Sequence, residues 1–175
     1  IRLPGIDALL QTDRDLQQLL VAERSMIFTD SKSEDFKKLV KAYQENVEQS
    51  AERWGSYKAL ASSAAEQAIV PRYDKAREEW LKLSMQVVKA REEDTREGRA
   101  LAMDLTNGAA KAKFDEMRNL LDKLTEINQE NAASAHLDAE RSYRNGLIAL
   151  AATATAGLLA GILLSLALGR GVTRP

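Results

Sequence analysis

Residues 6–29 have the sequence IDALLQTDRDLQQLLVAERSMIFT, in which apolar side chains recur at steps of three, four or seven residues. This spacing predicts a helix with one apolar face, because three or four residues are close to one helical turn. The residues on that face are Ile6, Leu9, Leu16, Leu20 and Ile27. Asp13 and Glu23 fall on the same face, where they either pair with basic residues, set a dimer register or line a polar pocket.

Two further helices are predicted from capping signals followed by the same spacing. A serine followed three residues later by a glutamate can form a capping box at a helix N-terminus, and this pattern occurs at Ser31 and at Ser63. We expect the second helix to run from Ser31 to about Ala61. The third is expected to start after Ser63, with a kink or a later start at Pro71.

The boundary between the third and fourth helices is predicted from the turn-forming residues Thr106, Asn107 and Gly108. The third helix would then end at Leu105, and a fourth would begin after Gly108. No Gly or Pro interrupts the chain between Gly108 and Gly146. The fourth helix is therefore expected to be long.

The whole chain has the composition of an all-α protein, with only nine Gly and three Pro among 175 residues. Four long helices joined by short turns bury their apolar faces best in an antiparallel up-down-up-down four-helix bundle. A two-stranded coiled coil is the structural alternative. The frequent turn signals disfavour it, because a coiled coil needs long uninterrupted helices.

The region 145–169 contains no ionisable side chain and is long enough to cross a bilayer as a helix. We therefore predict three parts: a four-helix bundle at 1–144, a transmembrane helix at 145–169 and a linker that starts at 170–175. The fourth helix is expected to continue into the span. Arg170 and Arg174 follow the span, so the positive-inside rule places the C-terminal side in the cytoplasm and residues 1–144 outside it.

The sequence gives little support for catalysis, because it has no Cys, one His and no Gly-rich phosphate loop. His136 is expected to be an ordinary exposed or interfacial residue. Trp54, Tyr57 and Trp80 are expected in the core rather than in an aromatic ligand cage. No enzymatic activity, cofactor or metal ion is predicted, and the net charge of −1 gives no nucleic-acid signal.

Several segments resemble the four-helix-bundle sensor domain of methyl-accepting chemotaxis proteins. The segments that carry the resemblance are DRDLQQ at 13–18, AERS at 22–25, Trp80, FDEMR at 114–118 and VTRP at 172–175. The last of these is similar to the opening of a HAMP linker. Their order, with bundle, span and HAMP-like start, is more specific than any one of them.

The resemblance implies a receptor in the inner membrane, with the sensor domain in the periplasm. It also implies a membrane helix before Ile1, a homodimer, and a cytoplasmic region after Pro175 that controls a histidine kinase through an adaptor. Sensor histidine kinases and cyclases carry similar outer domains. A membrane helical bundle that only binds a partner, or has only a structural role, is the alternative of a different class.

The ligand of such a sensor is expected to be a small anion, an organic acid or an amino acid, held where helix ends converge far from the membrane. Arg24 is the leading candidate, because a guanidinium binds a carboxylate through two parallel hydrogen bonds. Arg99, Lys111 and Arg118 are expected to add positive charge. Pairing of Arg24 with a surface carboxylate is the opposing interpretation.

Overall fold

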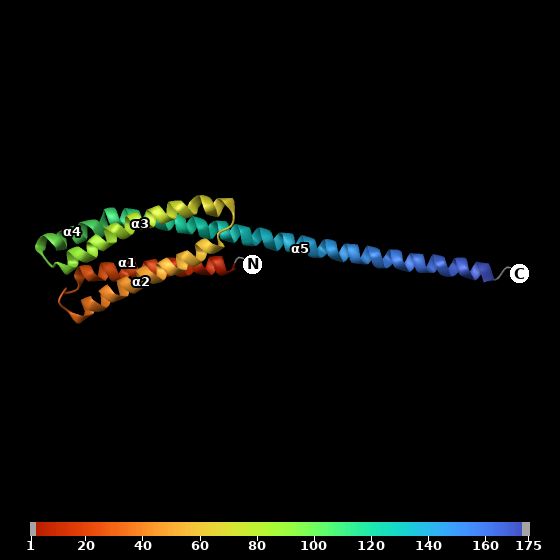
Figure 1. Ribbon diagram of the computed structural model, residues 1–175, viewed down its shortest axis with the longest axis horizontal. Coiled ribbons are helices and arrows are strands. Elements are labelled where there is room, and N and C mark those ends of the chain that lie inside the picture. Colours follow the sequence, from red (N-terminus) through yellow and green to blue (C-terminus); the bar gives the residue numbers. More distant parts are fainter. Residues whose placement is uncertain (1–2, 173–175) are drawn as a thin grey trace. The chain divides into compact units, whose positions relative to one another are not determined.

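The computed structural model describes the backbone of residues 3–172 and the side chains of residues 3–166 and 168. These residues form five α-helices and no strand (Figure 1). The helices are α1 (Leu3–Phe28), α2 (Glu34–Leu60), α3 (Ala64–Glu92), α4 (Arg96–Asn107) and α5 (Ala109–Val172). The HAMP-like segment predicted at the C-terminus falls mostly on residues 173–175, which lie outside the described residues.

The chain divides into two compact units, Ile1–Ala132 and Ala133–Pro175. In the first unit α1 lies beside α2, and α3 lies beside α4 and the start of α5 (Figure 1). Glu79 of α3 pairs with Lys113 of α5, with Nζ 2.7 Å from Oε2, because these helices run antiparallel. The predicted all-α four-helix bundle is confirmed: α4 and the first part of α5 together form its fourth helix.

The turn between the third and fourth bundle helices lies at residues 93–95, so the predicted boundary at Thr106–Gly108 is wrong. Asp94 has a φ of 51°, and Thr95 caps α4 by accepting a hydrogen bond from the Gly98 amide at 2.9 Å. Gly108 separates α4 from α5 without ending the helical hydrogen bonding. Its amide donates to the Asp104 carbonyl at 2.9 Å, and its own carbonyl accepts from Ala112 at 3.0 Å.

The capping prediction holds for one helix and fails for another. Ser63 and Glu66 form the predicted capping box at the start of α3. At α2 the cap is Ser33, whose hydroxyl accepts from the Phe36 amide at 3.1 Å, and the box predicted at Ser31 is absent. Pro71 lies inside α3, which begins at Ala64.

The core of the first unit is built from the aromatic residues predicted to lie there. Trp54, Tyr57 and Trp80 are buried; the Trp54 ring lies 4.1 Å from Tyr73 and the Trp80 ring 5.1 Å from Phe114, centroid to centroid. These contacts join α2 to α3 and α3 to α5. Aromatic pairs of this kind stabilise a core beyond the burial of their area.

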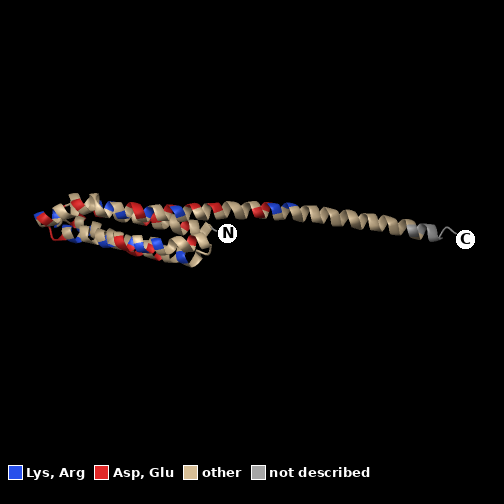
Figure 2. Ribbon diagram, turned by 90° about the horizontal axis from the view of Figure 1, so that it is seen from above, with Lys and Arg blue, Asp and Glu red and all other residues tan. Residues whose placement is uncertain are grey.

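The second unit is the remaining part of α5, and its described side chains are exposed. Residues 145–169 of α5 include no charged residue, and Figure 2 draws the described part of this stretch in tan, without blue or red. An 18-residue window here has a mean hydropathy of 2.2, and none of it is buried. By length and composition, this helix can cross a membrane.

Candidate sensory site

A buried polar layer crosses the first unit and takes one side chain from each bundle helix. Glu23 of α1 accepts hydrogen bonds from Ser84 of α3 and from Thr106 of α4, the latter at 2.7 Å. The Ser84 hydroxyl is also bonded to the hydroxyl of Tyr43 in α2 at 2.9 Å. All four residues are buried. Because each comes from a different bundle helix, a shift of any one of these helices would alter the hydrogen bonds of the layer.

The Glu23 carboxyl has no basic side chain among its hydrogen-bond partners in the polar layer. Burial raises the pKa of Glu23 above its ordinary value of 4.5, and this effect exceeds the lowering by Ser84, Thr106 and the charge of Arg24. Burial likewise raises the pKa of Tyr43 to about 12. Burial in the layer therefore shifts the Glu23 carboxyl toward its protonated form relative to an exposed glutamate.

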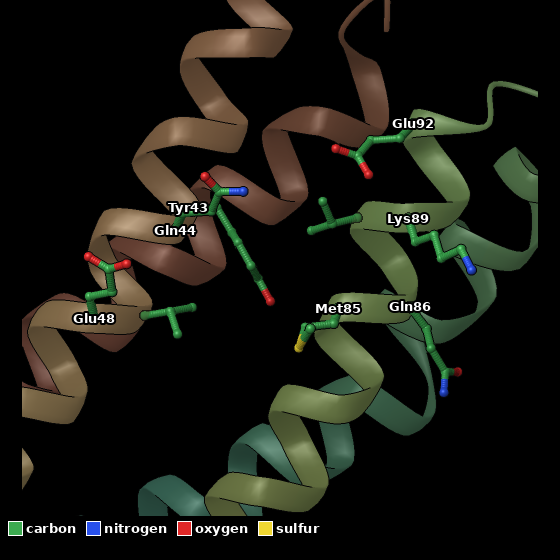
Figure 3. A pocket seen from close by; sticks show the side chains of 9 residues that line it. Tyr43, Gln44, Glu48, Met85, Gln86, Lys89 and Glu92 are labelled. Atoms are coloured by element: carbon green, nitrogen blue, oxygen red, sulfur yellow. The ribbon is translucent and has the colours of Figure 1, made fainter.

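A groove of about 570 Å³ lies between α2 and α3, directly beside this layer. Its apolar surface is formed by Tyr43, Val47, Met85 and Val88, and its polar side chains are Gln44, Glu48, Gln86, Lys89 and Glu92. Figure 3 shows Tyr43 and Met85 pointing into the space between the two helices. Tyr43 thus belongs both to the groove and to the polar layer. The volume lies within the usual range for small-molecule sites.

A second polar cluster lies at the opposite end of the first unit, near the turn between α2 and α3. Glu66 accepts from Tyr57 at 3.0 Å, from Asn128 at 2.9 Å and from the Ser63 amide at 2.9 Å. Burial raises the pKa of the Glu66 carboxyl, but these donors together outweigh it and lower the pKa to about 2. This cluster joins α2, α3 and α5 and holds an ionised carboxylate.

Buried Arg91, near the C-terminal end of α3, fixes the adjacent end of α1. Its Nε donates to the Met26 carbonyl and its Nη2 to the Thr29 carbonyl, both at 2.9 Å. Met26 lies in the last turn of α1 and Thr29 directly follows the helix, where carbonyls lack most of their intrahelical amide partners. Sequence reasoning missed Arg91, because its position gives no sign that it reaches a different helix.

The two acidic residues predicted on the inner face of α1 have different surroundings. Glu23 is buried, as the spacing suggested, whereas Asp13 is part-exposed and pairs with Arg118, Nε to Oδ1 at 3.0 Å. The fully buried carboxylate in this part of α1 is Asp15, which Arg14 and Arg53 bind. Asp15 was missed because the strict spacing placed Asp13, two residues earlier, on the buried face.

The four predicted ligand residues do not gather at one point. Arg24 is exposed on α1 and no ion pair to it is found in the described part of the chain. Arg99 pairs with Asp94 at 2.8 Å, Lys111 with Asp115 and Arg118 with Asp13. None of the four lines the α2–α3 groove. Their role in holding an anion stays a prediction.

His136 is exposed on α5, with Nε2 3.5 Å from Glu140 Oε1. Within residues 3–166, no three His, Asp or Glu side chains are placed together as metal ligands.

Comparison with known proteins gives a family for this architecture. Residues 1–143 match the model of the four helix bundle sensory module for signal transduction. No curated protein and no solved structure matches the chain. The matched segment includes all four residues of the polar layer and the whole α2–α3 groove. The chain therefore belongs to the four-helix-bundle sensory modules of methyl-accepting chemotaxis proteins.

Proposed function

We propose that the chain is the ligand-sensing and membrane-spanning part of a bacterial chemoreceptor. On this proposal the first unit binds a small molecule outside the cytoplasm, and α5 carries the resulting conformational change across the inner membrane to a module that controls a histidine kinase. The chain catalyses no reaction itself.

One observation carries the proposal: α5 supplies both core residues of the bundle and the apolar stretch that can span a membrane. Phe114, Met117, Leu121 and Leu124 are buried core residues of α5. The same helix is continuous to Val172, through the uncharged stretch. A change in bundle packing therefore displaces a helix that also enters the bilayer, which is what a transmembrane relay requires.

Orientation and membrane location rest on the positive-inside rule and on family membership. Arg170 follows the uncharged stretch directly, whereas Arg141 and Arg144, which precede it, stand beside Asp138 and Glu140. Arg170 and Arg174 after the span favour a cytoplasmic C-terminal side by this rule, and the equal number of arginines before the span weakens the signal, so the orientation depends mainly on family membership. The first unit would then lie in the periplasm.

The proposed homodimer is supported by an exposed apolar stripe on α1. Leu3, Leu10, Val21 and Phe28 are 57 to 84% exposed. They are spaced by 7, 11 and 7 residues, and each step returns to nearly the same side of a helix. Two copies that pack these stripes together remove them from water. Such an arrangement is self-complementary about a two-fold axis.

A receptor that carries residues 1–175 in front of a characterised kinase-control module tests the proposed function. Compounds are first screened for those that raise the melting temperature of residues 1–144, a segment that includes the complete first unit. We expect at least one such compound to change kinase activity in membranes that contain the fusion. A set of stabilising compounds none of which alters kinase activity would support the alternative of a non-sensing bundle.

A further inference from the structure

We propose that the α2–α3 groove binds a small molecule with an apolar or aromatic body and a positively charged amino group. This inference rests on the proposed sensory function, since it names the ligand class and the place of binding for that sensor. It differs from the organic anion expected from Arg24, so the two can be separated by experiment.

The apolar surface of the groove suits a hydrophobic ligand body. Met85 is 61% exposed to solvent, although its side chain points into the space between α2 and α3 (Figure 3). Val88 and Tyr43 also line the groove, and both are buried. A ligand that covers Met85 therefore removes apolar surface from water without requiring the helices to separate.

The charges around the groove favour a cation over an anion. The groove is lined by two carboxylates, those of Glu48 and Glu92, and by one ammonium group, that of Lys89. In Figure 3 the Glu92 carboxylate reaches toward the groove, while the Lys89 side chain points away from it. An ammonium group in the groove would gain a charge-assisted contact with Glu92, whereas a carboxylate there would be repelled.

Tyr43 gives the groove a direct connection to the rest of the bundle. Its ring lines the groove, and its hydroxyl is 2.9 Å from Ser84 Oγ, which donates to Glu23. A ligand that shifts Tyr43 must change a hydrogen-bond chain to which α1, α2, α3 and α4 all contribute. Binding in the groove thus has a route to every helix of the bundle, which a site confined to one helix surface lacks.

Three probes of similar shape and different charge test the ligand class. Calorimetry is performed on the full chain in lipid nanodiscs with phenethylamine, 2-phenylethanol and 3-phenylpropionate. We expect saturable binding that is tightest for the amine and weakest for the carboxylate. Glu92→Gln should weaken amine binding by up to about fivefold, the usual scale for an exposed ion pair, and leave the alcohol unchanged. Glu93→Gln, which removes the same charge one residue outside the groove, is the matched control.

Met85→Arg tests the place of binding, because it fills the groove and adds a repelling charge. The exposed position of Met85 lets the fold tolerate this change, which circular dichroism verifies. Leu101→Arg, at another exposed apolar residue, is the control. Binding of the amine should disappear in Met85→Arg and persist in Leu101→Arg and Arg24→Ala. Tighter binding of the carboxylate, binding that survives Met85→Arg, or no saturable binding of any probe overturns the proposal.

Failure of this inference and failure of the sensory function give different results. If a compound of another class changes kinase output while the groove variants respond like the parent, the sensory function holds and the groove is not the site. If phenethylamine binds in the groove but leaves kinase output unchanged, the groove is a binding site and its proposed role in sensing is wrong.

Discussion

The Thr106 hydroxyl donates a hydrogen bond to Glu23 Oε1 at 2.7 Å, joining residues that are 83 positions apart in the chain. Thr106 is the second-last residue of α4, two residues before Gly108, which separates α4 from α5. The bond therefore connects the inner face of α1 to the boundary between α4 and α5 in the fourth bundle helix. A change in the protonation of Glu23 therefore affects this bond and, through it, the packing of the fourth bundle helix.

Glu23→Gln is expected to change how the stability of the bundle depends on pH. Because folding raises the pKa of Glu23 above 4.5, the folded state holds a proton that the unfolded state releases. The stabilisation from this residue is complete below pH 4.5 and is lost as pH rises through the raised pKa. Glutamine keeps the shape without titrating, so the variant should lose less stability over that interval. Urea unfolding at several pH values measures the free energy of unfolding of both proteins.

The matched control is Glu52→Gln, which removes an exposed carboxylate of α2. Its pH profile should follow that of the parent. If Glu23→Gln also follows the parent profile across the whole interval, the Glu23 carboxyl titrates alike in the folded and unfolded states.

Glu66→Gln is expected to have the opposite pH signature. Folding lowers the pKa of Glu66 to about 2, so its stabilisation is present above pH 4.5 and is lost as pH falls toward 2. The variant should be less stable than the parent at pH 7, with a difference that shrinks as the pH falls. Acid titration followed by tryptophan fluorescence reports this difference. A gap between variant and parent that stays constant down to pH 2 would contradict the assignment.

Arg91→Ala is expected to reduce the free energy of unfolding by about 3 kcal/mol, because the Met26 and Thr29 carbonyls lose charge-assisted hydrogen bonds from a buried guanidinium. Arg91→Lys should recover part of this loss, since an ammonium can reach one carbonyl but cannot bind two in the same geometry. Denaturant unfolding measures the free energy of unfolding of the parent, Arg91→Ala and Arg91→Lys. Arg99→Ala, at an exposed ion pair, should change stability by less than about 1 kcal/mol. Equal losses for Arg91→Ala and Arg99→Ala would mean that Arg91 does not hold the end of α1.

The sequence predicted the helices and the aromatic core well, because periodicity records which face of a helix is apolar. It failed at Gly108, where glycine was interpreted as a turn. The amide and carbonyl of Gly108 keep their helical partners, so helical hydrogen bonding continues across the boundary between α4 and α5 and the chain does not turn back there. The real turn depends on Asp94 and Thr95, whose signals are weaker than a Thr-Asn-Gly run.

The polar layer shows a second limit of sequence reasoning. Glu23 was recognised as an acid on an apolar face, but Tyr43, Ser84 and Thr106 gave no sign that they meet it. Their convergence depends on the register between helices, and periodicity within one helix does not set that register. The groove beside Tyr43 was missed for the same reason, because the separation between α2 and α3 is a tertiary property.

Val21→Asp is expected to weaken self-association of the first unit, because it places a charge in the middle of the exposed stripe on α1. Sedimentation equilibrium on residues 1–144 at several concentrations should show the parent associating weakly and the variant remaining monomeric. Leu101→Asp, on an exposed part of α4, should associate like the parent. Equal effects of the two substitutions would place the dimer contact elsewhere.

Signal transfer through α5 is expected to require that the helix stay rigid between residues 132 and 145. Ser142 and Tyr143 are exposed positions inside the continuous helix, so an insertion between them leaves the bundle core untouched. Seven added residues correspond to almost two full turns and nearly restore the rotational phase. Seven alanines keep the segment helical, whereas seven glycines lose about 1 kcal/mol of helix propensity each and form a flexible joint.

In the fused receptor the alanine variant should still respond to a ligand, and the glycine variant should bind the ligand without changing kinase activity. Because the two insertions have the same length, a glycine variant that responds as strongly as the alanine variant would show that the signal does not travel through a rigid α5.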